Sequence, residues 1–301
     1  MRPSILPWGG GVWYGVGMRL SIMVMWVAAA MVVGAAPADD AFAAVWREHR
    51  ALTNDHDRAI TVFREALARR NADGSAALGR YAPIVQTLEG WRWVAKRNTA
   101  EAERAFTAAL MTSGSRDAAA NAADWVARRW LTRLDRERVV EALKAYYGSN
   151  VIYPDTLAGL STLPPDKQPP KTDRFGKAWQ YSPAAMRRIR VGANQTYTLT
   201  SAELKESSAL KDFFTKAYPS PAMAFRPSGQ GAVEVRGELG GARGQGVGAS
   251  DGNASGGMEI LGIIREGMQI SGFQLATVDA DGRFAIITDG DFWFTALQGG
   301  R

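Results

Sequence analysis

The sequence has no cysteine and only two histidines among its 301 residues. The lack of cysteine excludes a disulfide framework, a thiolate zinc site, a cysteine nucleophile and a lipid-modified N-terminal cysteine. His49 and His56 lie two turns apart on a helical stretch, too far for one metal ion, and we expect both to be solvent-exposed. Zinc-protease and phosphate-loop motifs are absent too. We therefore expect no catalytic residue, no cofactor and no metal.

The sequence also has only a small excess of positive over negative charge. Lys and Arg number 36 against 30 Asp and Glu, a net charge of +6, which is too weak and too evenly spread to indicate nucleic-acid binding. We interpret the densest basic cluster as a solvated edge and four C-terminal aspartates as turn residues rather than calcium ligands. The cluster is Arg187, Arg188 and Arg190, and the aspartates are Asp279, Asp281, Asp289 and Asp291.

An uncharged apolar run over residues 20–36 follows Arg19 and ends in small residues. A positive flank, a short apolar run and a small-residue end are typical of a secretory signal peptide, predicted here as residues 1–38 with Met18 as an alternative start. The run also reaches the lower length limit for a spanning helix, so an uncleaved inner-membrane anchor is the alternative. In both cases the rest of the chain is expected in the periplasm, touching a membrane only through an uncleaved leader.

Hydrophobic residues make up 46% of the whole sequence, so most of the chain is expected to fold. Shifts in composition divide the part after the leader into four regions. We predict a multidomain α+β protein. Its parts are a helical region over 39–134, a helix with a small antiparallel sheet over 135–218, a flexible Pro/Gly/Ser linker over 219–257 and a small all-β domain over 258–301.

The helical region contains a small-and-aromatic spacing that resembles the tetratricopeptide repeat. Its residues are Gly90, Trp93, Ala102, Phe106 and Ala109. The small residues would let two helices approach closely, and the two aromatics would fill the groove between them. Thr99 is the expected N-cap of the second helix.

A weaker copy of this spacing occurs at Ala59, Phe63 and Ala66, so the repeat covers about residues 40–112. A helix over 117–131 would cap the stack, because such units need neighbours for stability. An ordinary helical bundle with the same spacing is the alternative. Stacked repeats usually present a concave surface to a peptide or protein.

The middle region resembles the C-terminal domain of the G-type major pseudopilins of type II secretion, over about residues 135–205. That family has a helix ending near paired tyrosines, a Tyr-Pro, a leucine-rich turn, an Asp-x-x-Gly turn and a closing Tyr-x-Leu-x-Ser strand. The matching residues here are Tyr146, Tyr147, Tyr153, Pro154, Leu157, Leu160, Asp173, Phe175, Gly176, Trp179, Tyr181, Tyr197, Leu199 and Ser201.

The resemblance implies that a helix over 135–147 packs on a small sheet formed by the segments around Trp179 and Tyr197. The residues agree, because Asp173 and Gly176 suit a turn with a side-chain acceptor and a positive φ. The family's usual proline after the turn aspartate is Arg174 here, and no prepilin cleavage motif is present. Glu203, Glu206 and Asp212 do not match the family's calcium loop. A reused periplasmic module is implied; an unrelated α+β domain is the alternative.

The C-terminal region alternates in the manner of four or five strands, with Asp281-Gly282 as a hairpin turn. It is similar to the small periplasmic β-domains of C-type secretion and P-type pilus proteins, which contact the secretin ring. Together these features predict a non-catalytic exported component or accessory scaffold of a type II secretion or type IV pilus-like system that binds protein partners. The alternatives are a general periplasmic scaffold for peptides or proteins and a cryptic cell-wall hydrolase using a pair of acids.

Overall fold

The structure is a computed structural model, and residues 1–37 and 238–258 are the longest stretches outside its described part. The described residues are 38–111, 117–185, 187–189, 192–204, 209–214, 218–220, 223–229, 231–237, 259–279 and 284–297. Helices come first and the larger sheets last, so the predicted α+β class is confirmed. Among the described residues, no helix combines the length and apolar character that crossing a membrane requires.

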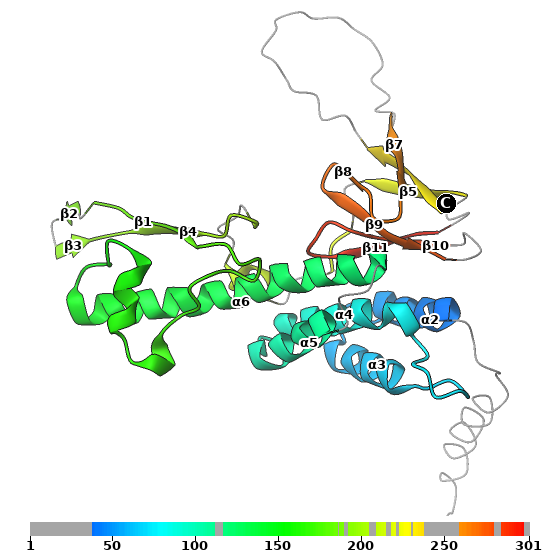
Figure 1. Cartoon of the computed structure of the whole chain (residues 1–301), viewed down its shortest axis with the longest axis horizontal. Helices are drawn as coiled ribbons and strands as arrows, with labels where there is room; N and C mark the ends of the chain where they lie inside the picture. Colours follow the sequence, from blue (N-terminus) through cyan, green and yellow to red (C-terminus); the bar gives the residue numbers. More distant parts are fainter. Residues whose placement is uncertain are drawn as a thin grey trace, which may run out of the picture.

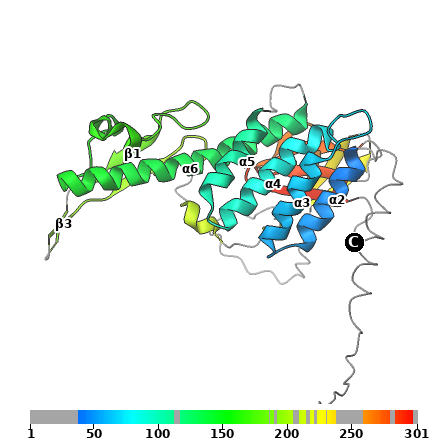
Figure 2. The same cartoon turned by 90° about the horizontal axis from the view of Figure 1, so that it is seen from below.

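The N-terminal half is a layer of helices packed side by side in chain order (Figure 2). They are α2 (Ala38–Ala51), α3 (His56–Ala68), α4 (Ala82–Ala95), α5 (Thr99–Met111) and α6 (Ala118–Asn150), with the short 3₁₀ turn η1 (Gly79–Tyr81) before α4. Both copies of the alanine–phenylalanine spacing face the core, since Ala59, Phe63, Ala102 and Phe106 are all fully buried.

At Gly90, α4 approaches the Phe106 side chain of α5 closely. A Cβ built there would lie 2.6 Å from Cε1 of Phe106, so only glycine fits. The expected position of Trp93 is wrong, because this side chain is half-buried and faces α3 rather than α5. Its indole N–H donates to Glu89, and the guanidinium of Arg64 lies 5.3 Å from the ring centroid. Trp91, pointing to the opposite side of α4, is the buried aromatic.

The cap of α5 also differs from the expectation. Asn98, one residue before the predicted Thr99, accepts a hydrogen bond from the Glu101 amide at 3.2 Å. Asn98 thus satisfies one of the amides that the first turn leaves without a partner.

Helix α6 is continuous for 33 residues and crosses the predicted boundary at 134/135. The cap helix expected over 117–131 and the helix expected over 135–147 are therefore one element. Its sequence has no proline, and its only glycine is Gly148, so nothing interrupts it. Asp117 caps its start by accepting from the Ala119 amide, and Val151 ends it in the left-handed conformation at φ 63°.

The second half of α6 carries the expected hairpin. Strand β1 (Gln180–Pro183) pairs antiparallel with β4 (Tyr197–Thr200), and β2 (Arg187–Ile189) with β3 (Gly192–Asn194) extends the hairpin outward (Figure 1). The ribbons around Trp179 and Tyr197 pack on this helix as predicted. Their common core contains Val139, Leu143, Leu160, Trp179 and Leu199. The sheet has only two strands at any level.

The C-terminal half contains two antiparallel sheets, ordered β5-β6-β7 and β11-β10-β9-β8. The strands are β5 (Ala224–Gly229), β6 (Ala232–Gly237), β7 (Glu259–Arg265), β8 (Gln269–Ile270), β9 (Phe273–Val278), β10 (Phe284–Thr288) and β11 (Trp293–Leu297). Four or five strands were expected after residue 258, and β7 to β11 lie there. The turn at Asp281-Gly282 lies outside the described residues, although Val278 and Ala285 on either side of it pair antiparallel.

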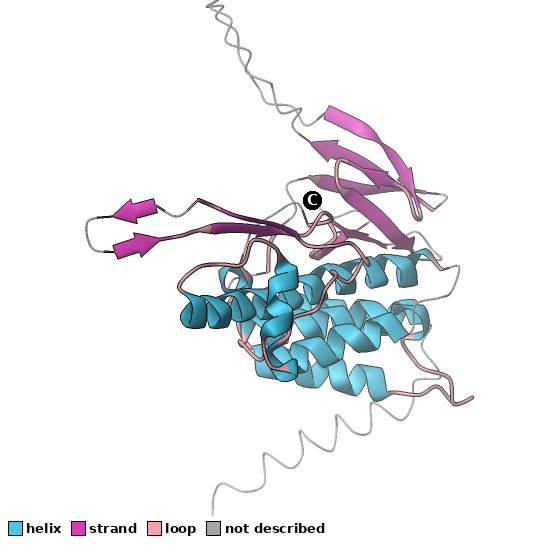
Figure 3. Ribbon diagram, turned by 60° about the vertical axis from the view of Figure 1, so that its left-hand side comes forward, coloured by secondary structure: helices cyan, strands magenta, loops and turns pink. Residues whose placement is uncertain are grey.

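The predicted linker is wrong at its start, because β5 and β6 form a hairpin there. Three prolines concealed it; Pro227 is tolerated because it sits at an irregularity in the β5–β6 register. The sheets also do not stand alone. One face encloses a core around Val235, Leu275 and Ile287. The other, with Ile286 and Trp293, joins the core of the helices, and Figure 3 shows the sheets lying on the helical layer.

Candidate functional site

A groove of about 740 Å³ lies where the first turn of α5 meets the middle of α6. The 3₁₀ turns η3 (Pro165–Lys167) and η4 (Leu210–Phe213) close its other sides. Its apolar lining residues are Ala100, Leu134, Ala142, Ala145, Pro169, Leu210 and Phe214. The groove lies between the N-terminal helices and the segments that pack on the second half of α6, so both contribute to one surface.

Charged side chains surround this apolar floor. Glu141 pairs with Lys144 at 2.7 Å, and Glu137 accepts a hydrogen bond from the Leu210 amide at 3.1 Å. Lys167 and Lys211 are different, because no ion pair or side-chain hydrogen bond within the described ranges engages either ammonium. An apolar floor with a polar rim is the usual anatomy of a protein-binding surface.

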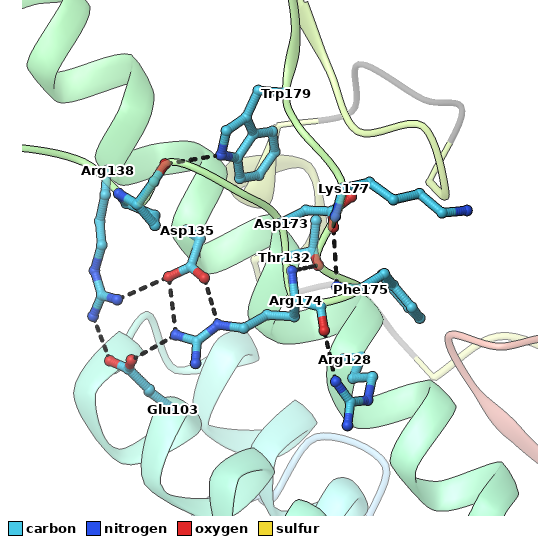
Figure 4. A network of polar contacts seen from close by, with 11 residues as sticks. Glu103, Arg128, Thr132, Asp135, Arg138, Asp173, Arg174, Phe175, Lys177 and Trp179 are labelled. Carbon is cyan, nitrogen blue, oxygen red and sulfur yellow. Dashed lines mark hydrogen bonds and ion pairs between the residues drawn. The ribbon is translucent and has the colours of Figure 1, made fainter. Parts of the chain in front are cut away.

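The wall of the groove is held by an ion network centred on Asp135 (Figure 4). Arg174 contacts both carboxylate oxygens of buried Asp135, with Nη2 at 3.1 Å from Oδ1, and Arg138 adds a contact of 2.9 Å. Glu103 on α5 pairs with both arginines. A bidentate guanidinium–carboxylate pair fixes orientation as well as distance. The network therefore joins α5, α6 and the Asp-x-x-Gly turn.

The backbone of Arg174 is fixed as well. Its carbonyl accepts from Arg128 at 2.7 Å and its amide donates to Thr132 at 3.3 Å. Arg174 is also the position at which the sequence departs from the proline expected from the resemblance. Its side chain docks the turn onto the helices. The departure was visible in the sequence, but its partner, 39 residues away, was not.

The turn itself has the predicted geometry. The Oδ1 atom of Asp173 accepts from the amides of Phe175 and Lys177 at 3.0 and 2.9 Å, and Gly176 has φ 77°. Ser201 donates to the other oxygen of this buried carboxylate at 2.8 Å, which ties the closing strand to the turn.

The remaining middle-region motif residues gather between hairpin and helix. Tyr181 donates its hydroxyl to the Pro154 carbonyl at 2.8 Å, and the rings of Tyr153 and Tyr197 are 4.7 Å apart. Trp179 and Leu199 are buried beside α6, with Tyr146 packed against them. The ring of Tyr147 is tilted against that of Tyr153, with centroids 4.6 Å apart. The repeat residues Gly90, Ala102, Phe106 and Ala109 lie instead in the helical core.

The expected exposure of the histidines is wrong. His49 is 1% exposed, and His56 is half-buried, because α4 covers them with Trp91 and Arg92. The fully buried guanidinium of Arg92 lies between the two rings, 3.1 Å from Nδ1 of His49 and 3.3 Å from Nδ1 of His56. No carboxylate forms an ion pair with Arg92 among the described residues, and burial lowers its pKa to about 10.

The stability of this cluster should depend on pH. Burial, followed by the charges of Arg92 and Arg50, lowers the pKa of His49 well below 6.5. In the unfolded chain the imidazole of His49 is protonated as pH falls below about 6.5, whereas in the folded protein it stays neutral. The unfolded state therefore binds more protons, and the free energy of unfolding decreases as pH falls below that value. Between pH 7.5 and 5.5 we expect a loss of up to about 1.4 kcal/mol from this group.

Denaturant unfolding at several pH values measures this slope. His49→Gln should flatten it, whereas His56→Gln, which removes the more exposed ring, should retain most of it. An unchanged slope in His49→Gln would show that other groups carry the pH dependence.

The C-terminal aspartates divide between two roles. Asp289 accepts from the amides of Asp291 and Phe292, and Asp279 from that of Phe284, as expected of turn residues. Asp291 is more than a turn residue, because its carboxylate binds Arg129 and Arg133 on α6. In the part of the chain that the structure describes, no three acids or histidines gather as metal ligands. Glu203 pairs with Lys177, and Asp212 accepts from the Ala209 amide.

Comparisons with protein-family models, with curated proteins and with solved structures found no match to this chain.

Proposed function

We propose that this chain is a non-catalytic, exported component or accessory scaffold of a type II secretion or type IV pilus-like envelope system, and that it binds protein partners. The observation that supports this most is the helix-and-hairpin module with its Asp173 turn. It has the elements implied by the pseudopilin resemblance, in the same order along the chain. The predicted leader supports export.

The groove is the surface that we assign to the partner. Its apolar floor of Leu134, Ala142 and Phe214 suits apolar side chains, and the rim can pair with charges of both signs. A peptide or helix face is therefore the preferred occupant. The network around Asp135 holds two walls of the groove in fixed positions, which lowers the cost of ordering them on binding.

Cross-linking in intact cells, followed by purification of the full chain, tests the system to which the protein belongs. We expect secretin, pilin or inner-membrane platform proteins among the cross-linked partners. Recovery of none of these would overturn the secretion assignment. If the recovered partners were unrelated to secretion, the general periplasmic scaffold would replace it.

A matched pair of tyrosine substitutions tests the groove. Ala100→Tyr fills the groove from the first turn of α5, while Ala68→Tyr places the same side chain at the exposed end of α3. We expect Ala100→Tyr to weaken binding of the identified partner at least about tenfold, the effect of losing one well-packed anchor. Ala68→Tyr should have no effect. Equal affinities would place the partner elsewhere on the molecule.

The hydrolase alternative has a direct test. Incubating the purified protein with peptidoglycan in a zymogram should give no clearing at any pH. Clearing that disappears when one acidic pair is replaced would establish an enzyme and overturn the non-catalytic assignment.

A further inference from the structure

A second cavity lies directly beside the groove. It measures about 400 Å³ and is bounded by the 3₁₀ turn η2 (Leu157–Thr162) and by the proline-rich segment 164–171. Its lining is mostly apolar, and Lys171 is the only charged residue in the described lining. Gln168 and Pro169 also line the groove, so the two cavities share one wall.

The shared wall is fixed by hydrogen bonds and by proline. The side-chain amide of Gln168 donates to two carbonyls at the C-terminal end of η2, at 3.1 and 2.8 Å. The Pro170 carbonyl accepts from the indole of buried Trp179 at 3.0 Å. The prolines of segment 164–171 restrict its backbone further. Because this wall is ordered within the fold, a ligand that crosses it loses little free energy in ordering it.

Cations without charged partners surround the two cavities. Lys167 and Lys211 line the groove, and Lys171 lines the second cavity. Arg97, just after α4, lies with its guanidinium carbon 5.6 Å from the ring centroid of Phe214, which also lines the groove. All four cations are exposed, and within the described ranges none of them forms an ion pair.

The acids around the cavities are mostly engaged inside the chain. Glu103 and Glu141 form ion pairs, and Glu137 both accepts a backbone hydrogen bond and lies 3.6 Å from a guanidinium. Asp166, next to Lys167, is the one lining acid with no such contact to another described residue. Four cations against one acid are therefore available to a ligand.

The backbone of Arg97 is strained. Its φ is 63°, a left-handed conformation that glycine normally adopts after the end of a helix. The geometry is fixed, because the Arg97 amide donates to the Val94 carbonyl at 2.8 Å and the Asn98 amide to the Trp93 carbonyl at 2.9 Å. A non-glycine residue in this conformation costs free energy, and strain of this kind is concentrated at functional sites.

We propose that the groove and the second cavity together bind one acidic peptide segment of a partner protein. One apolar side chain enters each cavity, and carboxylates of the segment lie against the four cations. The inference rests on the proposed protein-binding function of the groove. Complementary charge selects the partner, and concave apolar cavities accept its side chains. Nucleic acid is the less suitable occupant, because its phosphates would pair with the cations but leave both apolar cavities empty.

Selection of short random peptides displayed on phage, with the purified full chain as the target, tests the chemistry of the ligand. We expect the selected peptides to carry Asp and Glu on both sides of two apolar positions. High salt should weaken their binding, because it screens the ion pairs. Selection of no binding peptide, or of peptides without an excess of acids, would overturn the proposal.

Matched variants locate the charged contacts of a selected acidic peptide, with fluorescence anisotropy as the measurement. Lys167→Gln with Lys171→Gln should weaken binding by about threefold for each lysine. Arg47→Gln with Arg58→Gln makes the same charge change on exposed residues of α2 and α3 and should have no effect. Equal losses in the two double variants would overturn the proposal.

Two single variants test the second cavity and the strained cation. Ala158→Tyr fills the second cavity and should weaken peptide binding at least about tenfold, whereas Ala68→Tyr should not. Unchanged affinity in Ala158→Tyr would overturn the proposal, because the peptide would then occupy the groove alone. Arg97→Gly should weaken binding about threefold while raising the Tm, since it removes a charge and relieves strain. Lost binding in this variant therefore cannot be attributed to unfolding.

These results can be separated from those of the cross-linking experiment. Binding of acidic peptides, together with cross-linked partners unrelated to secretion, would support this inference and overturn the secretion assignment. Selected peptides without acids, together with cross-linked secretion components, would overturn this inference and support the secretion assignment.

Discussion

Asp291→Asn should lower the free energy of unfolding by about 3–5 kcal/mol, the usual cost of leaving a buried charge without its partner. The carboxylate of Asp291 binds Arg129 at 2.7 and 3.2 Å and Arg133 at 2.8 and 2.7 Å. The Arg133 side chain is only 2% exposed, so its guanidinium would have to stay buried without a counterion. Denaturant unfolding measures the loss as a lower midpoint.

The Asp291 backbone strengthens the expected effect, because its carbonyl accepts from the Trp130 indole at 2.8 Å. Side chain and backbone together connect the β10–β11 turn to α6. Glu203→Gln is the matched control, since it breaks an ion pair with Lys177 that is exposed to solvent and therefore contributes little to stability. Equal losses in the two variants would mean that the Asp291 cluster is open to water.

The carboxylate of Asp291 should also make the free energy of unfolding depend on pH in the acidic range. Burial raises the pKa of Asp291, but the charges and hydrogen bonds of Arg133 and Arg129 outweigh burial and hold the pKa below its ordinary value. The stabilisation is therefore full above the unfolded pKa of about 3.9 and is lost as pH falls through the folded pKa. Asp291→Asn should lose this part of the acid sensitivity.

Gly90→Ala and Gly148→Ala should change stability in opposite directions. Both replace a helical glycine with the best helix former, a gain of about 0.5–1 kcal/mol from propensity alone. At Gly90 the added methyl group would lie within 2.8 Å of three Phe106 ring atoms. Phe106 cannot move aside, because it is fully buried and stacked on Trp130 with ring centroids 5.9 Å apart. Overpacking of this kind costs about 1–3 kcal/mol.

At Gly148 no heavy atom lies within 4 Å of the position of the new methyl group, so only the propensity gain remains. Denaturant midpoints of the two variants, with unchanged m values, measure the difference. A stabilised Gly90→Ala variant would show that α4 and α5 can separate without loss, and the close approach assigned to Gly90 would be wrong.

The sequence was sufficient to predict those features that depend on residues close together along the chain. The helical spacing of Phe63 and Phe106 predicted buried faces, and Asp173 with Gly176 predicted a turn, because each depends on neighbours a few positions away. The sequence did not predict ion pairs between side chains that are far apart along the chain. Arg174 with Asp135 and Asp291 with Arg133 are such pairs, and in a chain with 66 charged residues no local pattern selects them.

The groove and the covered histidines were missed for the same reason. The sequence of the helix that carries His49 gives no local indication that this side chain is buried. It is covered by Trp91 of α4 and by Tyr218, which are distant along the chain. The groove requires η3 and η4 to meet α5 and α6, which is a property of the assembled fold. The hairpin of β5 and β6 was hidden by the prolines before it and by Pro227, which lies at the irregularity within β5.

Helix α6 has a mechanical consequence, because its first half belongs to one hydrophobic core and its second half to another. At 1.5 Å per residue it is a rod of about 50 Å. With no proline within it, such a rod bends little. A tilt of α6 at the groove would therefore move its far end through a larger arc, so the two hydrophobic cores along this helix are mechanically coupled.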